Sequence, residues 1–356
     1  MSVSLLVNRL LLAVRERLVR RPRRDLGRLG QSLREDGIGG TWRAVVRHLA
    51  RRPAPDPGGE PRTSVALQAE PVLHPVTPDA LEVARSVRGA SNPPAIILLG
   101  VWVRSGTGFV SNLLGLHPDV HRYPNEMWEI PFLENTDSLL TFSDRFLAGY
   151  PYNQGKIGED DLLALFGSAF IAHMYSHTRP GARALLTRPG VWFLEYFFTV
   201  FPHEHLLLLL RDGRDVVTSA LATWPNRSFA EECRRWSAST RAILAFCRLH
   251  ADSDRRFWLG RYEDAERDCE GFVTEVFRHL GLDPSVYPFE QALELPVTGS
   301  STFAEVQRGT WVSRAKTADF SPVGRWQRWS RQERQIFKEL AGQALVESGY
   351  ASDLDW

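Results

Sequence analysis

Strand-like and helix-like hydrophobic patterns alternate along most of the chain. The apolar runs at 95–101 and 205–210 are short and uninterrupted, which predicts strands buried on both faces of a parallel sheet. After each run, apolar positions recur at helical spacing, which predicts helices within 107–116 and 212–224. Further segments predict helices over 161–175, 269–282 and 330–350, and a strand and turn over 257–265. The alternation indicates an α/β fold of three layers, a parallel sheet flanked by helices, with ligand sites at the carboxyl ends of the strands.

Composition divides the chain into three regions. Residues 1–52 hold thirteen arginines against four acidic residues, a local net charge of +9 in a chain whose overall net charge is +1. Residues 53–90 begin with a run rich in proline and glycine, PAPDPGGEPRTS, which indicates a linker region. The alternating strand and helix patterns all come later, so we expect the main domain to span 91–356.

The basic N-terminal region carries an amphipathic pattern. Apolar residues recur there at helical spacing between arginines: Leu6, Leu10, Ala13, Val14 and Leu18. Such a helix can lie on an anionic membrane surface, although packing on its own domain or on a partner subunit is the commoner role of an apolar stripe. No uncharged run approaches the ~20 residues that a bilayer span needs, and the residue order of a secretory signal is absent. We expect a cytoplasmic protein, with peripheral membrane contact through this helix as the alternative.

The cysteines point the same way. Cys233, Cys247 and Cys269 have neither the even count nor the close spacing of a disulfide framework or a zinc site. This favours a reducing compartment. We expect no metal site and no nucleic-acid partner.

The segment GVWVRSGTGF, residues 100–109, lies between the first predicted strand and its helix. Glycines let a backbone approach an anion, and the following helix N-terminus directs free N–H groups towards it. The candidate phosphate-binding residues are Arg104, Ser105, Gly106, Thr107 and Gly108. A nucleotide-binding Walker loop requires lysine where Thr107 stands, which disfavours a kinase. The alternative without a ligand is a turn that uses glycine for tightness alone.

A second candidate phosphate site follows the second buried strand. Arg211 stands at the carboxyl end of that strand, and Ser219 comes eight residues later, early in the next helix. An arginine fork with a nearby hydroxyl suits a second phosphate. Two such sites at neighbouring strand ends indicate a nucleotide that is phosphorylated at both ends of its ribose.

Four segments resemble the motifs of sulfotransferases that use 3′-phosphoadenylyl sulfate (PAPS), most closely the bacterial, carbohydrate and tyrosylprotein branches. They are VRSGTGFVSNLLGLHPDV, HLLLLLRDGRDVVTS, GRYEDAERDCEGFVTEVFRHLGL and SPVGRWQRWS, in the family's order over about 94–350. The resemblance implies a fold like that of P-loop NTPases and makes 91–356 the catalytic domain. It implies that Arg104 to Gly108 hold the 5′-phosphosulfate, although the family usually has Thr or Ser where Gly108 stands. It further implies that Arg211 and Ser219 hold the 3′-phosphate, and that Gly324, Arg325 and Trp326 approach the nucleotide.

The implied reaction is transfer of a sulfuryl group from PAPS to a hydroxyl or amine acceptor, with release of 3′-phosphoadenosine 5′-phosphate (PAP) and no required metal. Such a transfer needs in-line positioning and neutralisation of the leaving phosphate, which is the expected role of Arg104. The acceptor stays open among a glycan, a glycolipid, a tyrosine and a small metabolite. The alternatives are a P-loop small-molecule kinase and an inactive PAP-binding module.

The acceptor needs a general base, and the resemblance places it in HRYPNEMWEIPFLEN, after HPDV. Glu126 fits the bacterial and tyrosylprotein spacing best, Glu129 is the second candidate, and Glu134 is less favoured. Arg188 lies where the family often has a residue near donor and acceptor, which implies a secondary role. Arg214 and Asp215 could pair with each other or cap their helix. Four histidines could also serve as the base, although a structural role is commoner for a lone histidine: His117, His121, His173 and His177.

Overall fold

The computed structural model describes residues 73–149, 152, 155–251, 257–307, 311–317 and 320–356. The chain divides into two units, Met1–Thr63 and Ser64–Trp356, and every element described below belongs to the second. The predicted basic helix and most of the predicted linker lie outside the described residues, so the hypothesis of membrane contact stays a prediction.

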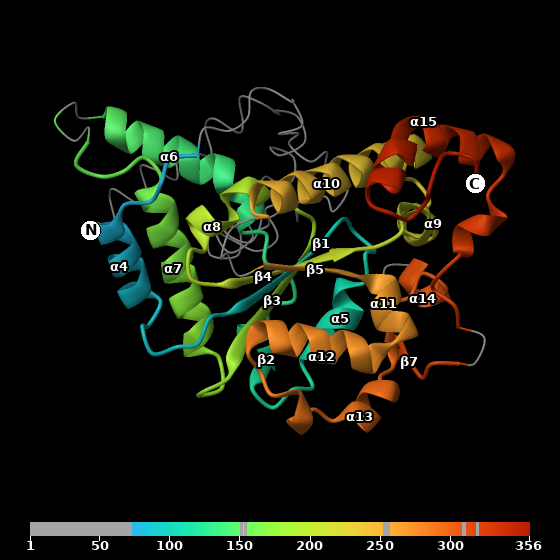
Figure 1. Cartoon of the computed structure of the whole chain (residues 1–356), viewed down its shortest axis with the longest axis horizontal. Helices are drawn as coiled ribbons and strands as arrows, with labels where there is room; N and C mark the ends of the chain where they lie inside the picture. Colours follow the sequence, from blue (N-terminus) through green and yellow to red (C-terminus); the bar gives the residue numbers. More distant parts are fainter. Residues whose placement is uncertain (1–72, 150–151, 153–154, 252–256, 308–310, 318–319) are drawn as a thin grey trace, which may run out of the picture. The chain divides into compact units, whose positions relative to one another are not determined.

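The second unit is built on a sheet of five parallel strands in the order β2-β3-β1-β4-β5 (Figure 1). In its centre, Ile96 of β1 pairs with Leu185 of β3 and with His205 of β4. The strands are β1 (Ile96–Gly100), β2 (Val120–Arg122), β3 (Arg183–Pro189), β4 (His205–Leu210) and β5 (Phe257–Arg261). The predicted α/β class is confirmed.

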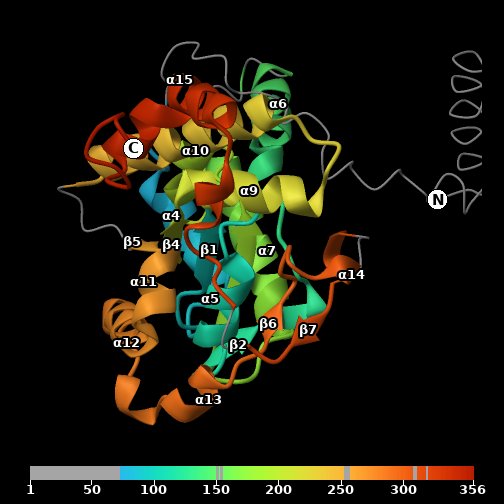
Figure 2. The same ribbon diagram turned by 90° about the vertical axis from the view of Figure 1, so that its right-hand side faces the viewer.

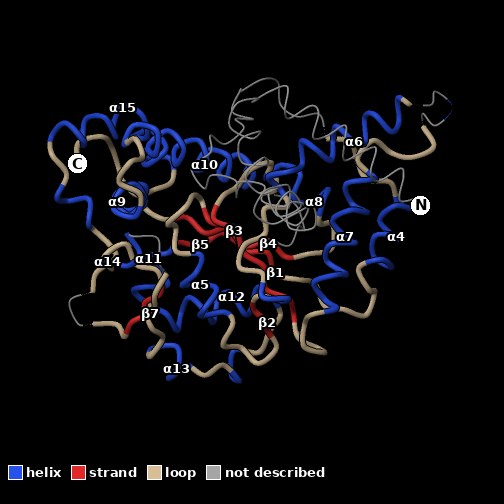
Figure 3. Tube along the Cα trace, turned by 180° about the vertical axis from the view of Figure 1, so that it is seen from behind, coloured by secondary structure: helices blue, strands red, loops and turns tan. Residues whose placement is uncertain are grey.

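Apart from His205 at the start of β4, the strands β1 and β4 are apolar because each separates two hydrophobic cores. Side chains of a strand alternate between faces, so Ile97 and Leu99 enter one core and Ile96 and Leu98 the other. Helices α7 (Asp161–Ser176), α8 (Phe197–Val200), α10 (Phe229–Leu249) and α15 (Arg331–Glu347) contribute to the first core. Helices α5 (Thr107–Leu114) and α12 (Cys269–Leu280) contribute to the second. The sheet therefore lies between two helical layers (Figures 1 and 3).

Most of the predicted helices form where the periodicity placed them. They are α5, α7, α9 (Gly213–Thr223), α12 and α15. Helix α9 begins after its N-cap residue Asp212, whose side chain accepts a hydrogen bond from the N–H of Arg214. α15 begins with a capping box, in which Ser330 is the N-cap and Glu333 its partner. Gly281 ends α12 in the left-handed conformation, φ +65°. The predicted turn after β5 is the short helix α11 (Tyr262–Arg267).

Several elements were not predicted. β3 carries Arg183, Thr187 and Pro189 within a buried strand, and this breaks the apolar run that marks β1 and β4. Helix α10 buries small polar residues along its core stripe, Ser237 and Thr240 among them, so its amphipathic pattern is weak. The other unpredicted elements of regular length are α4 (Pro78–Val87) and α6 (Thr136–Ala148). The short elements are η1 (Pro124–Glu126), η2 (Leu133–Asn135), η4 (Leu194–Tyr196), η5 (Pro284–Val286), α13 (Phe289–Leu293), β6 (Val297–Thr298), α14 (Ala304–Gln307), β7 (Ser313–Arg314) and η6 (Arg325–Arg328).

Helix α4 lies in the segment interpreted as a linker region. It packs against α7, and its N-cap residue Thr77 donates its hydroxyl and its N–H to the carboxylate of Asp161 at 2.8 Å each. Beyond it, Arg88 forms a buried ion pair with Glu204 at 2.6 Å. Residues 73–90 thus contain a helix that packs on the main domain. Among the described residues, no helix is long and apolar enough to cross a membrane.

The antiparallel strands β6 and β7 and helix α14 lie at the carboxyl ends of the sheet strands. β6 lies beside α5, and α14 beside α9 (Figure 2). Both α5 and α9 begin at the carboxyl end of a central strand, so this segment covers the edge where the sequence places its two phosphate sites.

Candidate active site

The loop between β1 and α5 has the backbone that an anion site requires. Gly106 is the N-cap of α5 with φ +92°, and a Cβ there would lie 2.2 Å from the ring of Tyr262. Only glycine fits this position. By contrast, a Cβ on Gly108 would meet nothing within 4 Å, so the hydroxyl residue expected there would have room. Arg104 itself adopts φ +67°, which is unusual for a residue with a side chain.

Two buried polar atoms in this site have no hydrogen-bond partner among the described residues. They are the hydroxyl oxygen of Ser105 and Nε of Arg211, one from each predicted phosphate motif. Buried donors are normally satisfied, and an unmade bond costs about 1–3 kcal/mol. Phosphate oxygens would supply the missing acceptors.

The guanidinium of Arg104 connects the two motifs. Its Nε donates to the hydroxyl of Ser219 at 3.1 Å, and Nη2 donates to the carbonyl of Gly299 at 2.6 Å. The ring of Trp311 lies 5.1 Å from the guanidinium carbon, within cation–π range. The first motif and the second, more than one hundred residues apart in sequence, therefore form one site.

Arg211 follows β4 and anchors the loop between β1 and α5. Its Nη1 donates to the carbonyl of Arg104 and its Nη2 to that of Pro322, both at 2.7 Å. The guanidinium also lies 4.2 Å from the ring of Tyr262. The carbonyl of Arg211 accepts from Nε1 of the buried Trp236 at 3.1 Å, which fixes the backbone from the core side.

Ser301 is a site residue that the sequence interpretation missed. Its buried hydroxyl lies 3.0 Å from that of Ser219 and accepts from Nη1 of Arg325 at 2.7 Å. It comes from the segment between β6 and α14, which has no periodic pattern. The signal that could have identified it is the run TGSST, where small hydroxyl residues cluster beside a glycine.

Three guanidinium groups, those of Arg104, Arg211 and Arg325, meet at this site, and none forms an ion pair with a carboxylate in the described part of the chain. Burial lowers the pKa of Arg104 to about 9, with repulsion from Arg211 and Arg325 adding to the effect. Burial and the neighbouring Arg211 likewise lower the pKa of Arg325. Concentrated positive charge without carboxylate partners is the electrostatics of a polyanion site.

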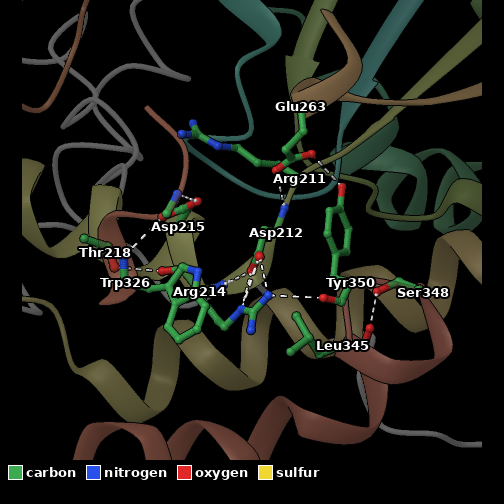
Figure 4. Close-up of polar contacts among 12 residues, drawn as sticks. Arg211, Asp212, Arg214, Asp215, Thr218, Glu263, Trp326, Leu345, Ser348 and Tyr350 are labelled. Carbon is green, nitrogen blue, oxygen red and sulfur yellow. Dashed lines mark hydrogen bonds and ion pairs between the residues drawn. The ribbon is translucent and has the colours of Figure 1, made fainter. Parts of the chain in front are cut away.

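The predicted GRW segment is attached to the second motif by a buried carboxylate. Asp215 accepts the N–H of Gly324 at 2.7 Å and the N–H of Trp326 at 3.3 Å, and burial raises the pKa of this carboxyl. The sequence allowed a pair between Arg214 and Asp215, but the two residues do not pair. Arg214 pairs with the N-cap residue Asp212 at 2.7 Å (Figure 4). Asp215 is thus the group that holds Gly324, Arg325 and Trp326 over the start of α9.

The three candidate glutamates differ in their partners. Glu129 and Glu134 both form ion pairs with Arg188, the residue given a secondary role, at the end of β3. Glu126 is exposed, and no side-chain partner for it is found among the described residues. It lies in a loop with unusual backbone, because Tyr123, Asn125 and Glu126 all adopt φ of +56° or +57°. Such clustering is common at functional sites, and it leaves Glu126 as the unpaired candidate.

The histidine candidates occupy other surroundings. His117 is buried and bonded to the carbonyl of Asp283 and the N–H of Asp119. His121 accepts from the N–H of Arg179 at 2.9 Å. His173 and His177 lie against each other at the end of α7, ring centroids 5.0 Å apart. Among the described residues, no histidine bonds to Arg104, Arg211 or Arg325. Within the described residues, no three His, Cys, Asp or Glu side chains gather as metal ligands would.

Comparison with known proteins decides the family. A model described as the sulfotransferase family matches residues 94–285, more than half of the chain. The chain belongs to the sulfotransferase family. The matched range of this sulfotransferase begins just before β1 and ends after α12, so it includes the phosphate loop, Arg211 and Ser219.

Individual relatives of this sulfotransferase are distant. Nodulation protein NoeE of Sinorhizobium fredii (strain NBRC 101917 / NGR234) is 26% identical over 292 residues, which cover 74% of this chain and 67% of that protein. The sulfotransferase domain from the Synechococcus PCC 7002 olefin synthase has a TM-score of 0.45 at 19% identity, covering 71% of this chain and 94% of that one. A sulfotransferase from Alicyclobacillus acidocaldarius has a TM-score of 0.42 at 14% identity, covering 71% and 93%.

Proposed function

We propose that this sulfotransferase moves a sulfuryl group from PAPS to a hydroxyl or amine acceptor and releases PAP. The observation that carries the proposal is a cluster of three arginines and two hydroxyls. Arg104 donates to Ser219 and Arg325 to Ser301, the two hydroxyls lie 3.0 Å apart, and Arg211 donates to the carbonyl of Arg104. A donor that bears phosphate at both the 3′ and the 5′ position would match this charge. It would also supply acceptors for the unpartnered atoms of Ser105 and Arg211.

The two ends of the donor have separate sites in this proposal. Ser105, Gly106, Thr107 and the N–H groups that open α5 hold the 5′-phosphosulfate. Arg211, Ser219, Ser301 and Arg325 hold the 3′-phosphate. Arg104 donates to Ser219 from the phosphate loop and so lies between the two sites.

In the proposed reaction, the bond between the sulfate sulfur and the bridging oxygen of the 5′-phosphate breaks as the acceptor oxygen bonds to sulfur. PAP leaves with the bridging oxygen, and the acceptor proton passes to Glu126. Arg104 stabilises the negative charge that grows on the leaving phosphate. Transfer of a sulfuryl group requires from the protein mainly the positioning of donor and acceptor and the electrostatic stabilisation of the leaving phosphate.

The first experiment measures PAP binding by calorimetry and transfer of label from [35S]PAPS in a cell extract. We expect PAP to bind and label to appear in an acceptor, while ATP is neither hydrolysed nor used. Separation of labelled lipid, protein, glycan and small molecules then identifies the acceptor class. Arg211→Ala should weaken PAP binding at least tenfold, since it removes a charge-assisted contact. Unchanged affinity in that variant would show that the 3′-phosphate binds elsewhere.

The base is tested in the same assay with two matched variants. Glu126→Gln should lower turnover by about 10²–10⁴-fold and leave PAP affinity unchanged, because proton transfer alone is lost. Glu129→Gln breaks an ion pair with Arg188, and its effect on turnover should be much smaller. The reverse ranking would transfer the role of base to Glu129. PAP binding with no transfer by the wild type to any acceptor would support the inactive binding module instead.

A further inference from the structure

An arginine lies against two tryptophan rings next to the proposed nucleotide site. The guanidinium carbon of Arg214 is 4.0 Å from the ring centroid of Trp326 and 4.6 Å from that of Trp356. The two indoles meet edge to face, with centroids 5.2 Å apart and an interplanar angle of 82°. We call Arg214, Trp326 and Trp356 the tryptophan clamp.

The clamp is anchored to α9 and α15. Arg214 is held by Asp212 through three hydrogen bonds of 2.7–3.1 Å, and its Nη2 donates to the carbonyl of Tyr350 at 3.2 Å (Figure 4). Trp356 packs against Phe337, a fully buried residue of α15, with centroids 5.9 Å apart. Lys338 covers the same indole at 5.1 Å. Trp356 therefore connects the core side of α15 with the ring of Trp326.

Arg325 depends on this support. It belongs to η6, a 3-10 helix of four residues, and such short helices have little stability of their own. Its guanidinium reaches Ser301 against the repulsion of Arg211. Asp215 fixes the backbone on both sides of Arg325, at Gly324 and Trp326. The clamp holds the side chain of Trp326, whose ring Arg334 and Trp329 also contact.

We propose that Trp356 is a positioning residue for donor recognition. By packing on Trp326 and Arg214 it holds η6 in place and so presents Arg325 to the 3′-phosphate. The inference rests on the proposed function. It assigns a role to a residue that lies outside the range matched by the family model.

The test compares two nucleotides that differ by one phosphate. PAP carries the 3′-phosphate and adenosine 5′-phosphate (AMP) lacks it, so a residue that acts through Arg325 affects the first and spares the second. In Trp356→Leu, which keeps apolar volume but loses the aromatic ring, we expect PAP affinity to fall about tenfold and AMP affinity to stay within twofold. The PAP/AMP affinity ratio should therefore fall about tenfold. Trp356→Phe keeps a ring and should retain most of the ratio.

Trp258→Ala is the matched control, because Trp258 packs against Phe272 and bonds Glu275 on α12, away from the clamp. It should leave the PAP/AMP ratio unchanged. An equal loss of affinity for PAP and for AMP in Trp356→Leu would mean a general structural role and would overturn the inference. Unchanged affinity for both nucleotides would overturn it as well. If Trp356→Leu does not fold, a Trp356→Phe variant with the tenfold loss would contradict the role of the ring. Failure of the wild type to bind PAP would overturn the proposed function and the inference together.

Discussion

At the scale of single residues, the buried arginines of this sulfotransferase fall into two groups. Arg88 and Arg214 lie within ion-pair distance of a carboxylate, Glu204 and Asp212, which is the usual condition for a buried charge. The arginines of the proposed donor site donate to hydroxyls and carbonyls and lie against aromatic rings, and in the described part of the chain none has a carboxylate within ion-pair distance. Burial of a charge without a counter-charge is costly, so this second group gains most from a bound polyanion.

A pair of glycine substitutions separates the loop geometry from general effects on α5. Gly106→Ala places a Cβ 2.2 Å from Tyr262 at a positive φ, so we expect a loss of stability of about 2 kcal/mol or more and loss of PAP binding. Gly108→Ala has free space and a helical position, so it should stabilise the fold by about 0.5 kcal/mol and leave PAP affinity unchanged. Thermal unfolding and calorimetry measure both. Normal PAP affinity in Gly106→Ala would contradict the role of this loop.

At the scale of elements, the sequence predicted the strands and helices whose hydrophobic pattern is clear within the segment itself. β1 and β4 are short runs of apolar residues apart from His205, and α5 and α9 carry apolar residues at helical spacing directly after them, so their pattern alone identifies them. The edge of the site made by β6, β7 and η6 consists of very short elements held by side-chain contacts from α9 and α5. Ser301 has its place only through those contacts. The run TGSST marks hydroxyl residues beside a glycine, but nothing local in it tells which hydroxyl faces Ser219 and Arg325.

The attachment of η6 to α9 by Asp215 leads to a prediction with a pH dependence. Asp215→Asn replaces one acceptor oxygen by an amide donor, so one of the N–H groups of Gly324 and Trp326 loses its partner. We expect PAP affinity to fall about tenfold and AMP affinity to change little. Protonation of Asp215 should act in the same direction, and because burial raises its pKa, the effect begins at a higher pH than for an ordinary aspartate.

Calorimetric titrations of PAP and AMP over a pH series measure this effect. The PAP/AMP affinity ratio of the wild type should decline as pH falls through the raised pKa of Asp215, and Asp215→Asn should lack that part of the decline. Protonation of the nucleotide phosphates affects both proteins equally, so the variant isolates the carboxyl. An identical pH dependence in the two proteins would exclude Asp215 as its source.

At the scale of the whole molecule, the proposed donor site exists only in the folded chain. Arg104 follows β1, Arg211 follows β4, and Arg325 and Ser301 come from the last quarter of the sequence. Folding brings these positive side chains together against their mutual repulsion, and burial, with this repulsion added, lowers the pKa of Arg104. The two cores on either side of the sheet supply the stabilisation that makes this arrangement possible.

Because PAP would bind the folded state alone, it should raise the thermal unfolding temperature. At a free PAP concentration one hundred times Kd the stabilisation is about 2.7 kcal/mol, equivalent to a rise on the order of 5 °C for a domain of this size. AMP at the same concentration should give a smaller rise, since it leaves the 3′-phosphate site empty. Both rises should shrink as NaCl increases, because screening weakens the attraction between phosphate and guanidinium. In Arg211→Ala, PAP and AMP should give nearly equal rises. A rise with PAP that is no larger than with AMP in the wild type, or that is insensitive to salt, would show that the three arginines do not form the site of the second phosphate.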